Sequence, residues 1–170
     1  MSTRHVFAAT FVATLVLNAC SAPAPTPPAE PTPPADEPGE LGQTWHNIAG
    51  GSETALLLTD ATNEGVLQLV CARSPARMIV RVRAFNVIES EERLSFGLDN
   101  EPTVFVAQTQ APTDGVEAEG PIDPAFLDRL VAAETVSASY GAQSLGPLPA
   151  PGREKAETFA AGCRAGAAGT

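Results

Sequence analysis

Four arginines in one short stretch are the side chains best suited to bind an anion. They are Arg73, Arg77, Arg81 and Arg83. A guanidinium group holds a phosphate or a carboxylate through paired hydrogen bonds, so the cluster suggests a site for lipid headgroups, glycan phosphate or the carboxylates of a partner. The alternative is cross-strand pairing on an exposed sheet face with Glu89, Glu91 and Glu92. We expect Arg81 and Arg83 to project from one strand face, and the pattern favours the pairing.

Two glutamates are the other candidates for a chemical role, as a catalytic carboxylate pair. Glu117 and Glu119 alternate along a possible strand, so they share one of its faces. A carboxylate pair can hydrolyse a glycosidic bond, but the same spacing is typical of a solvated edge strand, which we expect here. The acidic turn at residues 60–64 lacks the ligand spacing of a calcium loop, so no metal site is expected.

The composition excludes several classes of protein. The chain has 10 Lys plus Arg against 20 Asp plus Glu, a net charge of −10, which argues against a nucleic-acid partner. It has two histidines and a single lysine, Lys155, so histidine-based metal sites, Ser-His-Asp triads and P-loop chemistry lack their residues. We therefore expect no cofactor and no classical enzyme.

The amino-terminal segment has the layout of an export signal. A basic start with Arg4 precedes an apolar run at residues 6–17. That run has about 12 residues, whereas a spanning helix needs roughly 20, so the segment is too short for a permanent anchor. We predict a signal peptide over residues 1–19 that is removed from the mature chain.

The residues at the end of this segment resemble the bacterial lipoprotein lipobox. The matching positions are Leu17, Asn18, Ala19 and Cys20. The resemblance implies that Cys20 becomes the acylated first residue of the mature protein and holds it on the membrane, since two or more acyl chains give stable anchoring. Ser21 at the next position is similar to the outer-membrane sorting pattern of enterobacterial lipoproteins. The alternative is an ordinary signal peptide with an incidental cysteine.

With Cys20 assigned to lipid, the folded part keeps one pair of cysteines, Cys71 and Cys163. Exported proteins reside where disulfides persist, so we expect these two to be bonded. The alternative is two buried free thiols. A redox role is disfavoured because catalytic pairs are usually close in the sequence.

A proline-rich segment separates Cys20 from the folded part. Residues 21–40 contain eight of the 16 prolines and four acidic residues. Such a segment adopts polyproline II and spans roughly 60 Å at about 3.1 Å per residue. We assign residues 20–40 to a lipidated cysteine followed by a semi-rigid tether.

Residues 41–170 predict one α+β domain with an antiparallel sheet or sandwich of about six or seven short strands and two helices late in the chain. Strands are expected at residues 54–59, 66–72, 78–85, 93–98, 103–108, 115–120 and 135–140, the sixth as an edge strand. A helix should begin after Asp123, with Pro124 in its first turn. A Gly- and Pro-rich loop at 141–152 should precede a final helix at 153–164.

The folded part also resembles small exported proteins of proteobacteria over roughly residues 45–164, among them uncharacterised lipoproteins and periplasmic proteins associated with type VI secretion. The similarity rests on Trp45, Cys71, the string at residues 96–102, the helix near Phe126, and Cys163 with Phe159. It implies a disulfide-stapled, β-rich domain and transfers no active site.

These features together predict a non-enzymatic lipoprotein of the bacterial cell envelope, anchored in the outer membrane and facing the periplasm. Its domain would bind an envelope protein or polymer. The alternative is a carboxylate-based envelope hydrolase or a hydrolase inhibitor. A pocket with two carboxylates of shifted pKa would favour the hydrolase, whereas a sheet face with an exposed apolar patch would favour the binding module.

Overall fold

The computed structural model describes residues 42–110 and 114–167. The predicted signal peptide, Cys20 and the proline-rich tether lie outside these residues. The strands are β1 (Thr44–Gly50), β2 (Glu53–Thr59), β3 (Gly65–Arg73), β4 (Ala76–Val82), β5 (Arg93–Leu98), β6 (Glu101–Ala107), β7 (Val116–Gly120), β8 (Thr135–Tyr140) and β9 (Gln143–Pro149). The helices are α1 (Pro124–Ala132) and α2 (Arg153–Ala167).

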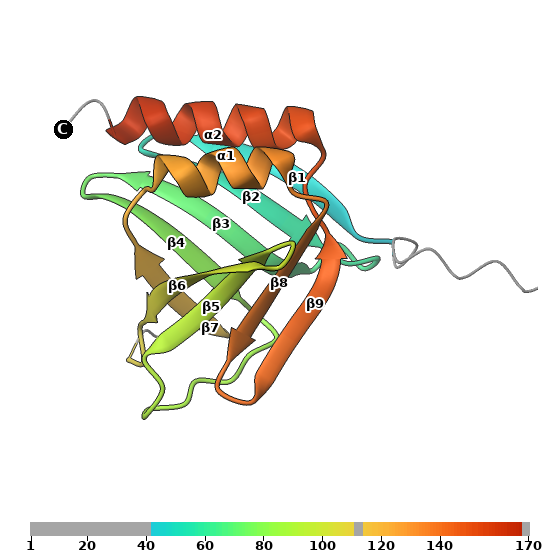
Figure 1. The fold of residues 1–170 in the computed structure, drawn as a ribbon, viewed down its shortest axis with the longest axis vertical. Coiled ribbons are helices and arrows are strands. Elements are labelled where there is room, and N and C mark those ends of the chain that lie inside the picture. The colour runs from blue at the N-terminus through green and yellow to red at the C-terminus, as the bar shows by residue number, and fades with distance from the viewer. Residues whose placement is uncertain (1–41, 111–113, 168–170) are drawn as a thin grey trace, which may run out of the picture. The chain divides into compact units, whose positions relative to one another are not determined.

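All nine strands belong to one antiparallel sheet with the order β1-β2-β3-β4-β7-β6-β5-β8-β9. The two edge strands approach each other at one point, where the Trp45 indole Nε1 donates a hydrogen bond to the Pro149 carbonyl at 2.9 Å. The sheet therefore curls back toward itself (Figure 1). The predicted α+β class with an antiparallel sheet is confirmed, in the form of one curled sheet.

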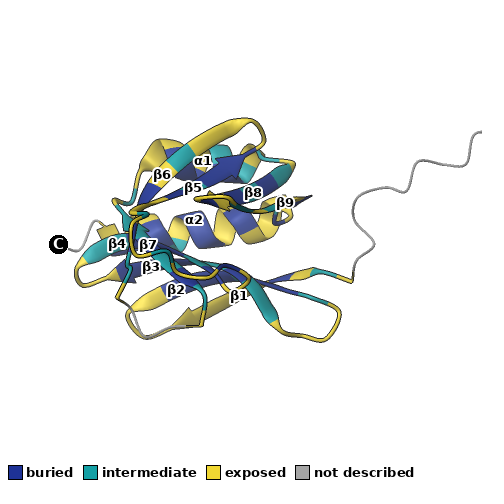
Figure 2. Cartoon of the chain, turned by 90° about the horizontal axis from the view of Figure 1, so that it is seen from below, coloured by how far each residue is buried: buried dark blue, intermediate teal, exposed yellow. Residues whose placement is uncertain are grey.

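Both helices lie across one end of the curled sheet (Figure 1). Viewed from the opposite end, α2 lies between the half formed by β1 to β4 and the half that contains β5, β6, β8 and β9 (Figure 2). The core fills the space that the sheet and the helices enclose, and Phe126 of α1 contacts Phe96 and Phe105 with ring centroids 6.0 and 5.8 Å apart. Neither helix of the described residues is long and apolar enough to span a membrane.

Helix α1 begins as the sequence predicts. The Asp123 carboxylate accepts a hydrogen bond at 2.9 Å from the Ala125 amide, one of the donors that a helix start leaves unpaired. Pro124 occupies the first turn, where a missing N–H costs nothing. Three apolar residues of the helix, Phe126, Leu127 and Leu130, are buried. The local pattern was therefore sufficient to place this helix.

The sheet has nine strands, so the expected number of six or seven is wrong. The missed elements are the two edges, β1 and β9. In β1 only Trp45 is buried, so the apolar alternation that marks a half-buried strand is missing. Strand β9 lies in the predicted Gly- and Pro-rich loop, and Pro147 and Pro149 are tolerated there because an edge strand leaves one row of N–H groups unpaired.

Strand β7 was expected at an edge but lies between β4 and β6. Its two acidic side chains suggested a solvated edge, and the arginines of β4 compensate them instead. The expected strand at residues 78–85 ends at Val82, so Arg83 lies in the following turn. Arg81 and Arg83 consequently do not project from a common strand face.

Tyr140 fastens the long connection between β4 and β5. Its side chain is buried on the inner face of β8 at 1% exposure. The hydroxyl lies 2.8 Å from the carbonyl oxygens of Ile88 and Glu91, to either of which it can donate, and it accepts a hydrogen bond at 3.2 Å from the Ile88 amide. One hydroxyl thus serves three backbone groups of residues 83–92.

Replacing Tyr140 by phenylalanine is expected to lower the free energy of unfolding by about 1 to 2 kcal/mol, because the ring is kept while partly buried backbone groups of Ile88 and Glu91 lose their partner. Urea unfolding of the variant measures this loss. The Ser139→Ala variant, exposed on the same strand, is the control and should stay within about 0.5 kcal/mol of the parent. Equal stability of Tyr140→Phe and the parent would contradict the role of the hydroxyl.

Candidate binding surface

The outer face of β3, β4 and β7 carries a cross-strand network of charges. Arg81 Nε donates to Glu117 Oε2 at 2.6 Å, and Arg81 Nη1 donates to Gln68 Oε1 at 3.2 Å. On the same face of β4 and β7, Arg77 Nε lies 3.3 Å from Glu119 Oε1, an ion pair without a hydrogen bond from this nitrogen. The two Arg81 contacts follow from the register, which sets Gln68 and Glu117 directly opposite Arg81 on its two neighbouring strands, whereas Arg77 reaches Glu119 diagonally because Glu119 lies opposite Ile79.

The other two arginines of the predicted cluster lie elsewhere. Arg73 at the end of β3 donates to the Gly51 carbonyl at 3.3 Å, and Arg83 lies 3.9 Å from the Asp114 carboxylate. The four guanidinium groups therefore do not converge, and each already has an oxygen partner. The paired carboxylates are Glu117, Glu119 and Asp114 rather than the expected Glu89, Glu91 and Glu92. Sequence proximity suggested those three, whereas the strand order decides the pairing.

An exposed apolar patch adjoins the network on the outer face of β6. Val104 and Val106 are 56% and 59% exposed, and we call these two residues the valine patch. The register places Val106 opposite Glu119 of β7 and Arg93 of β5, while Val104 lies opposite Ser95. The patch is thus apolar at its centre and bordered by charged and hydroxyl groups. In the sequence, Val104 and Val106 alternate with other residues and so share one face of a strand, but this pattern does not reveal whether that face is buried or exposed.

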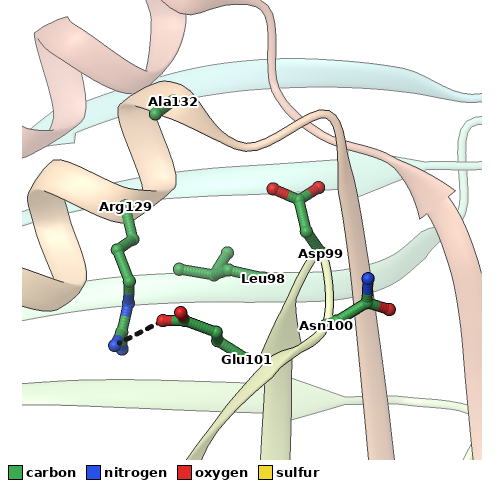
Figure 3. A pocket seen from close by; sticks show the side chains of 6 residues that line it. All are labelled: Leu98, Asp99, Asn100, Glu101, Arg129 and Ala132. Carbon is green, nitrogen blue, oxygen red and sulfur yellow. Dashed lines mark hydrogen bonds and ion pairs between the residues drawn. The ribbon is translucent and has the colours of Figure 1, made fainter.

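A shallow pocket of about 340 Å³ lies at the turn between β5 and β6, beside the end of α1. The lining residues are Leu98, Asp99, Asn100, Glu101, Arg129 and Ala132 (Figure 3). Arg129 Nη1 donates to Glu101 Oε2 at 3.2 Å, and Arg129 Nη2 donates to the Thr103 hydroxyl at 2.8 Å. The Arg129 guanidinium in the pocket is therefore hydrogen-bonded to side-chain oxygens of Glu101 and Thr103.

The Asp99 carboxylate in this pocket is hydrogen-bonded to the start of β8 and the residue before it. Its carboxylate accepts hydrogen bonds from the amides of Thr135 at 2.9 Å and Glu134 at 3.0 Å and lies 3.3 Å from the Thr135 hydroxyl. These hydrogen bonds lower the pKa of Asp99, and the Thr135 amide has the largest effect, followed by the Glu134 amide. A general acid needs a raised pKa, so this shift has the opposite direction from the one that hydrolysis requires. Asp99 holds the connection between α1 and β8.

The Asp99→Asn variant tests this role through pH. Asparagine tolerates the left-handed backbone at this position (φ 52°) but removes the charge that the two amides stabilise. Because the folded pKa is lowered, the contribution of Asp99 is present above the unfolded pKa of about 3.9 and is lost as the pH falls through the folded value. The parent should therefore be more stable than Asp99→Asn at pH 7, and the difference should vanish in acid.

Urea midpoints of both proteins at neutral and acidic pH measure this convergence. The exposed Glu89 provides a control, since Glu89→Gln should leave the neutral midpoint unchanged. A gap between parent and Asp99→Asn that is constant over the whole pH range would contradict the charge-based role.

Cys71 and Cys163 form a disulfide, as expected. It joins the inner face of β3 to α2, and both residues are buried at 1% and 0% exposure. The remaining cysteine of the chain, Cys20, lies outside the described residues. The disulfide accounts for two of the three cysteines.

The acidic turn after β2 is held by its own backbone. Asp60 accepts hydrogen bonds from the Thr62 hydroxyl at 2.7 Å and from the amides of Thr62 and Glu64 at 2.8 and 3.0 Å. The Thr62 hydroxyl and the Glu64 amide are the main causes of its lowered pKa. Within residues 42–110 and 114–167, no group of three or more His, Cys, Asp or Glu side chains could hold a metal ion.

No protein-family model and no curated protein matches the chain. Its structure is similar to the crystal structure of invasion associated protein B from Bartonella henselae, with 12% sequence identity and a TM-score of 0.46. The match covers 71% of this chain and 99% of that one. A likeness at this level transfers neither a function nor a partner.

Proposed function

We propose that the chain is a non-enzymatic lipoprotein of the bacterial cell envelope. In this account the signal peptide at residues 1–19 exports the chain, acylated Cys20 anchors it in the outer membrane, and residues 21–40 hold residues 41–170 away from the bilayer on the periplasmic side. The domain acts by binding another component of the envelope. The resemblance to exported proteobacterial proteins, including those associated with type VI secretion, fits this role.

The disulfide supports the anchor. A buried bond between Cys71 and Cys163 is typical of proteins that leave the reducing cytosol. The bond leaves Cys20 as the third cysteine of the chain, the one that the lipobox resemblance assigns to lipid. Acylation with several chains then gives membrane attachment that one chain would not.

The observation that carries the binding role is the valine patch. More than half of each side chain is exposed, and exposed apolar residues rimmed by polar ones are typical of interaction sites. Arg93, Glu119 and Ser95 around the patch supply both signs of charge and a hydroxyl. An apolar centre with a mixed polar rim is the composition of protein interfaces, so we favour a protein partner over an envelope polymer.

Neither the arginine cluster nor the carboxylates favour the other candidate roles. Arg81 is hydrogen-bonded to Glu117 and Arg77 is ion-paired with Glu119, so an incoming phosphate would compete with a carboxylate at each arginine. The same contacts occupy the carboxylate pair that a glycoside hydrolase would need. The hydrolase alternative therefore gains no support from these side chains.

A double variant of the patch tests the binding role. Pull-down from envelope membranes should recover a partner with the parent and with the control Ala161→Ser, whose site is exposed on α2. The Val104→Ser and Val106→Ser double variant should lose at least about tenfold of that recovery, because interface centres carry most of the binding free energy. Equal recovery with the double variant and the control would refute the patch as the binding surface. An unchanged thermal unfolding curve establishes that the variants are folded.

A further inference from the structure

The two edges of the sheet differ in how they are protected against pairing. Natural proteins guard an edge strand with prolines, charged residues or bulges, because its unpaired N–H and C=O groups attract another strand. Strand β9 contains Pro147 and Pro149, and its pairing with β8 is irregular. Strand β1, with the sequence TWHNIAG, contains no proline and no Asp, Glu, Lys or Arg, and pairs with β2 without a register shift. The β1 edge therefore has none of these protections.

Most of β1 is accessible. At the beginning of β1 the Trp45 side chain is buried, and its indole N–H donates a hydrogen bond to the Pro149 carbonyl, so the two edges of the sheet meet there. Beyond this point His46–Gly50 is exposed at every residue, and we call this segment the open edge. Ile48 at its middle is 44% exposed and is one of four large exposed apolar residues in the described part of the chain. Within residues 42–110 and 114–167, β1 pairs with β2 alone, so the open edge combines a free backbone edge with an apolar side chain at its centre.

We propose that the open edge pairs antiparallel with the open edge of a second copy of this chain. With all of His46–Gly50 paired, Ile48 lies on the two-fold axis opposite its counterpart, and Asn47 lies opposite Ala49. Two isoleucines then cover each other, which is a favourable cross-strand contact. The new backbone hydrogen bonds continue the sheet from one copy into the other.

The charge distribution favours a second copy over a foreign peptide. A two-fold interface places residues near the axis close to the same residues of the other copy, so charged side chains there would repel each other. The open edge contains no Asp, Glu, Lys or Arg, and His46 is its single ionisable residue. An extended cationic peptide would instead be recognised by acidic side chains on the strand itself, and β1 carries none. The acidic residues of the domain lie on other elements. They oppose association at long range, so the dimer should strengthen as salt screens the repulsion.

The pairing closes at two copies. The prolines of β9 prevent a second strand from joining at the other edge, so addition at β1 alone gives a dimer and no fibre. In the antiparallel pair, the two chains enter β1 from opposite ends of a five-residue ribbon about 17 Å long. If the proposed tethers exist, each spans roughly 60 Å, and both copies can be anchored in one membrane. This last point rests on the proposed anchor, whereas the pairing itself does not.

Cysteine cross-linking tests the pairing in the mature chain with Cys20→Ser, so that the lipid has no part in the result. Opposite residues of antiparallel strands have Cα atoms about 4.5 to 5.5 Å apart, within the range of a disulfide. Under mild oxidation, Ile48→Cys should give a covalent dimer at least about tenfold faster than Val87→Cys, whose site is also exposed but lies in the connection between β4 and β5. Equal rates for the two variants, or no dimer from Ile48→Cys, would overturn the proposal.

Sedimentation equilibrium provides a second readout without new cysteines. The Cys20→Ser chain should show a concentration-dependent dimer that grows with salt, Ile48→Lys should be monomeric, and Val87→Lys should behave as the parent. The two lysines on the axis would repel each other without disturbing the fold. A monomeric parent at all concentrations, or loss of the dimer in Val87→Lys but not in Ile48→Lys, would contradict pairing through β1.

Discussion

Replacing Cys71 and Cys163 together by alanine is expected to lower the free energy of unfolding by about 4 to 5 kcal/mol. The two cysteines are 92 positions apart, so their bond constrains a long loop of the unfolded chain. The chain-entropy model gives larger stabilisation for longer loops. A loss of this size is a large fraction of the stability of a domain of this length.

The position of the bond adds a local consequence. Helix α2 packs against β1, β2, β3 and α1, and the disulfide is its covalent attachment to the sheet. Its buried face consists mainly of small residues, with Phe159 as the single large one. We therefore expect α2 to be the element that loosens first when the bond is missing. Hydrogen exchange should show faster exchange in α2 than in β3 of the double variant.

Denaturant unfolding of the parent and the double variant measures the global loss. Adding a reductant to the unfolded parent should bring its stability down to that of the double variant, while the double variant should not respond. Cys20→Ala serves as the matched cysteine control and should unfold like the parent. A double variant as stable as the parent would mean that the bond does not contribute to stability.

The second large effect concerns where the protein is found. Changing Cys20 to alanine should move it from the membrane fraction to the soluble fraction of the envelope, because several acyl chains at about 0.8 kcal/mol per buried CH₂ are lost at once. The domain itself should stay folded, since Cys20 does not belong to its disulfide.

Fractionation of envelopes with antibody detection measures this redistribution. The Ser21→Ala variant changes the adjacent residue and should remain with the membrane. If Cys20→Ala stays with the membrane as fully as the parent, attachment has another origin and the lipobox assignment is wrong. Full-length chain retained in the cytoplasm would contradict the export signal instead.

Sequence patterns were most reliable where a local signal defined the element. Asp123 and Pro124 located the start of α1, and the strand expected at residues 66–72 corresponds to β3. The pairing of Cys71 with Cys163 was also predictable, because these are the two cysteines that remain once Cys20 is assigned to lipid. These features depend on neighbouring residues or on counting, and they need no knowledge of which strands pair.

The sequence was insufficient where strand order decides the result. Arg81 pairs with Glu117 because β7 inserts between β4 and β6, and no local pattern encodes that insertion. The edges β1 and β9 were missed because edge strands need not alternate in hydrophobicity. Asp99 looked like an ordinary turn residue until the fold brought the amides of residues 134 and 135 to its carboxylate.

Mass spectrometry of the native protein, digested without reduction, tests the central claim most directly. That claim is that Cys20 is acylated while Cys71 and Cys163 are bonded to each other. We expect an amino-terminal peptide that begins at Cys20 and carries acyl chains, together with a disulfide-linked pair of peptides containing Cys71 and Cys163. An unmodified Cys20, a retained signal peptide, or Cys20 in a disulfide with either partner would contradict it.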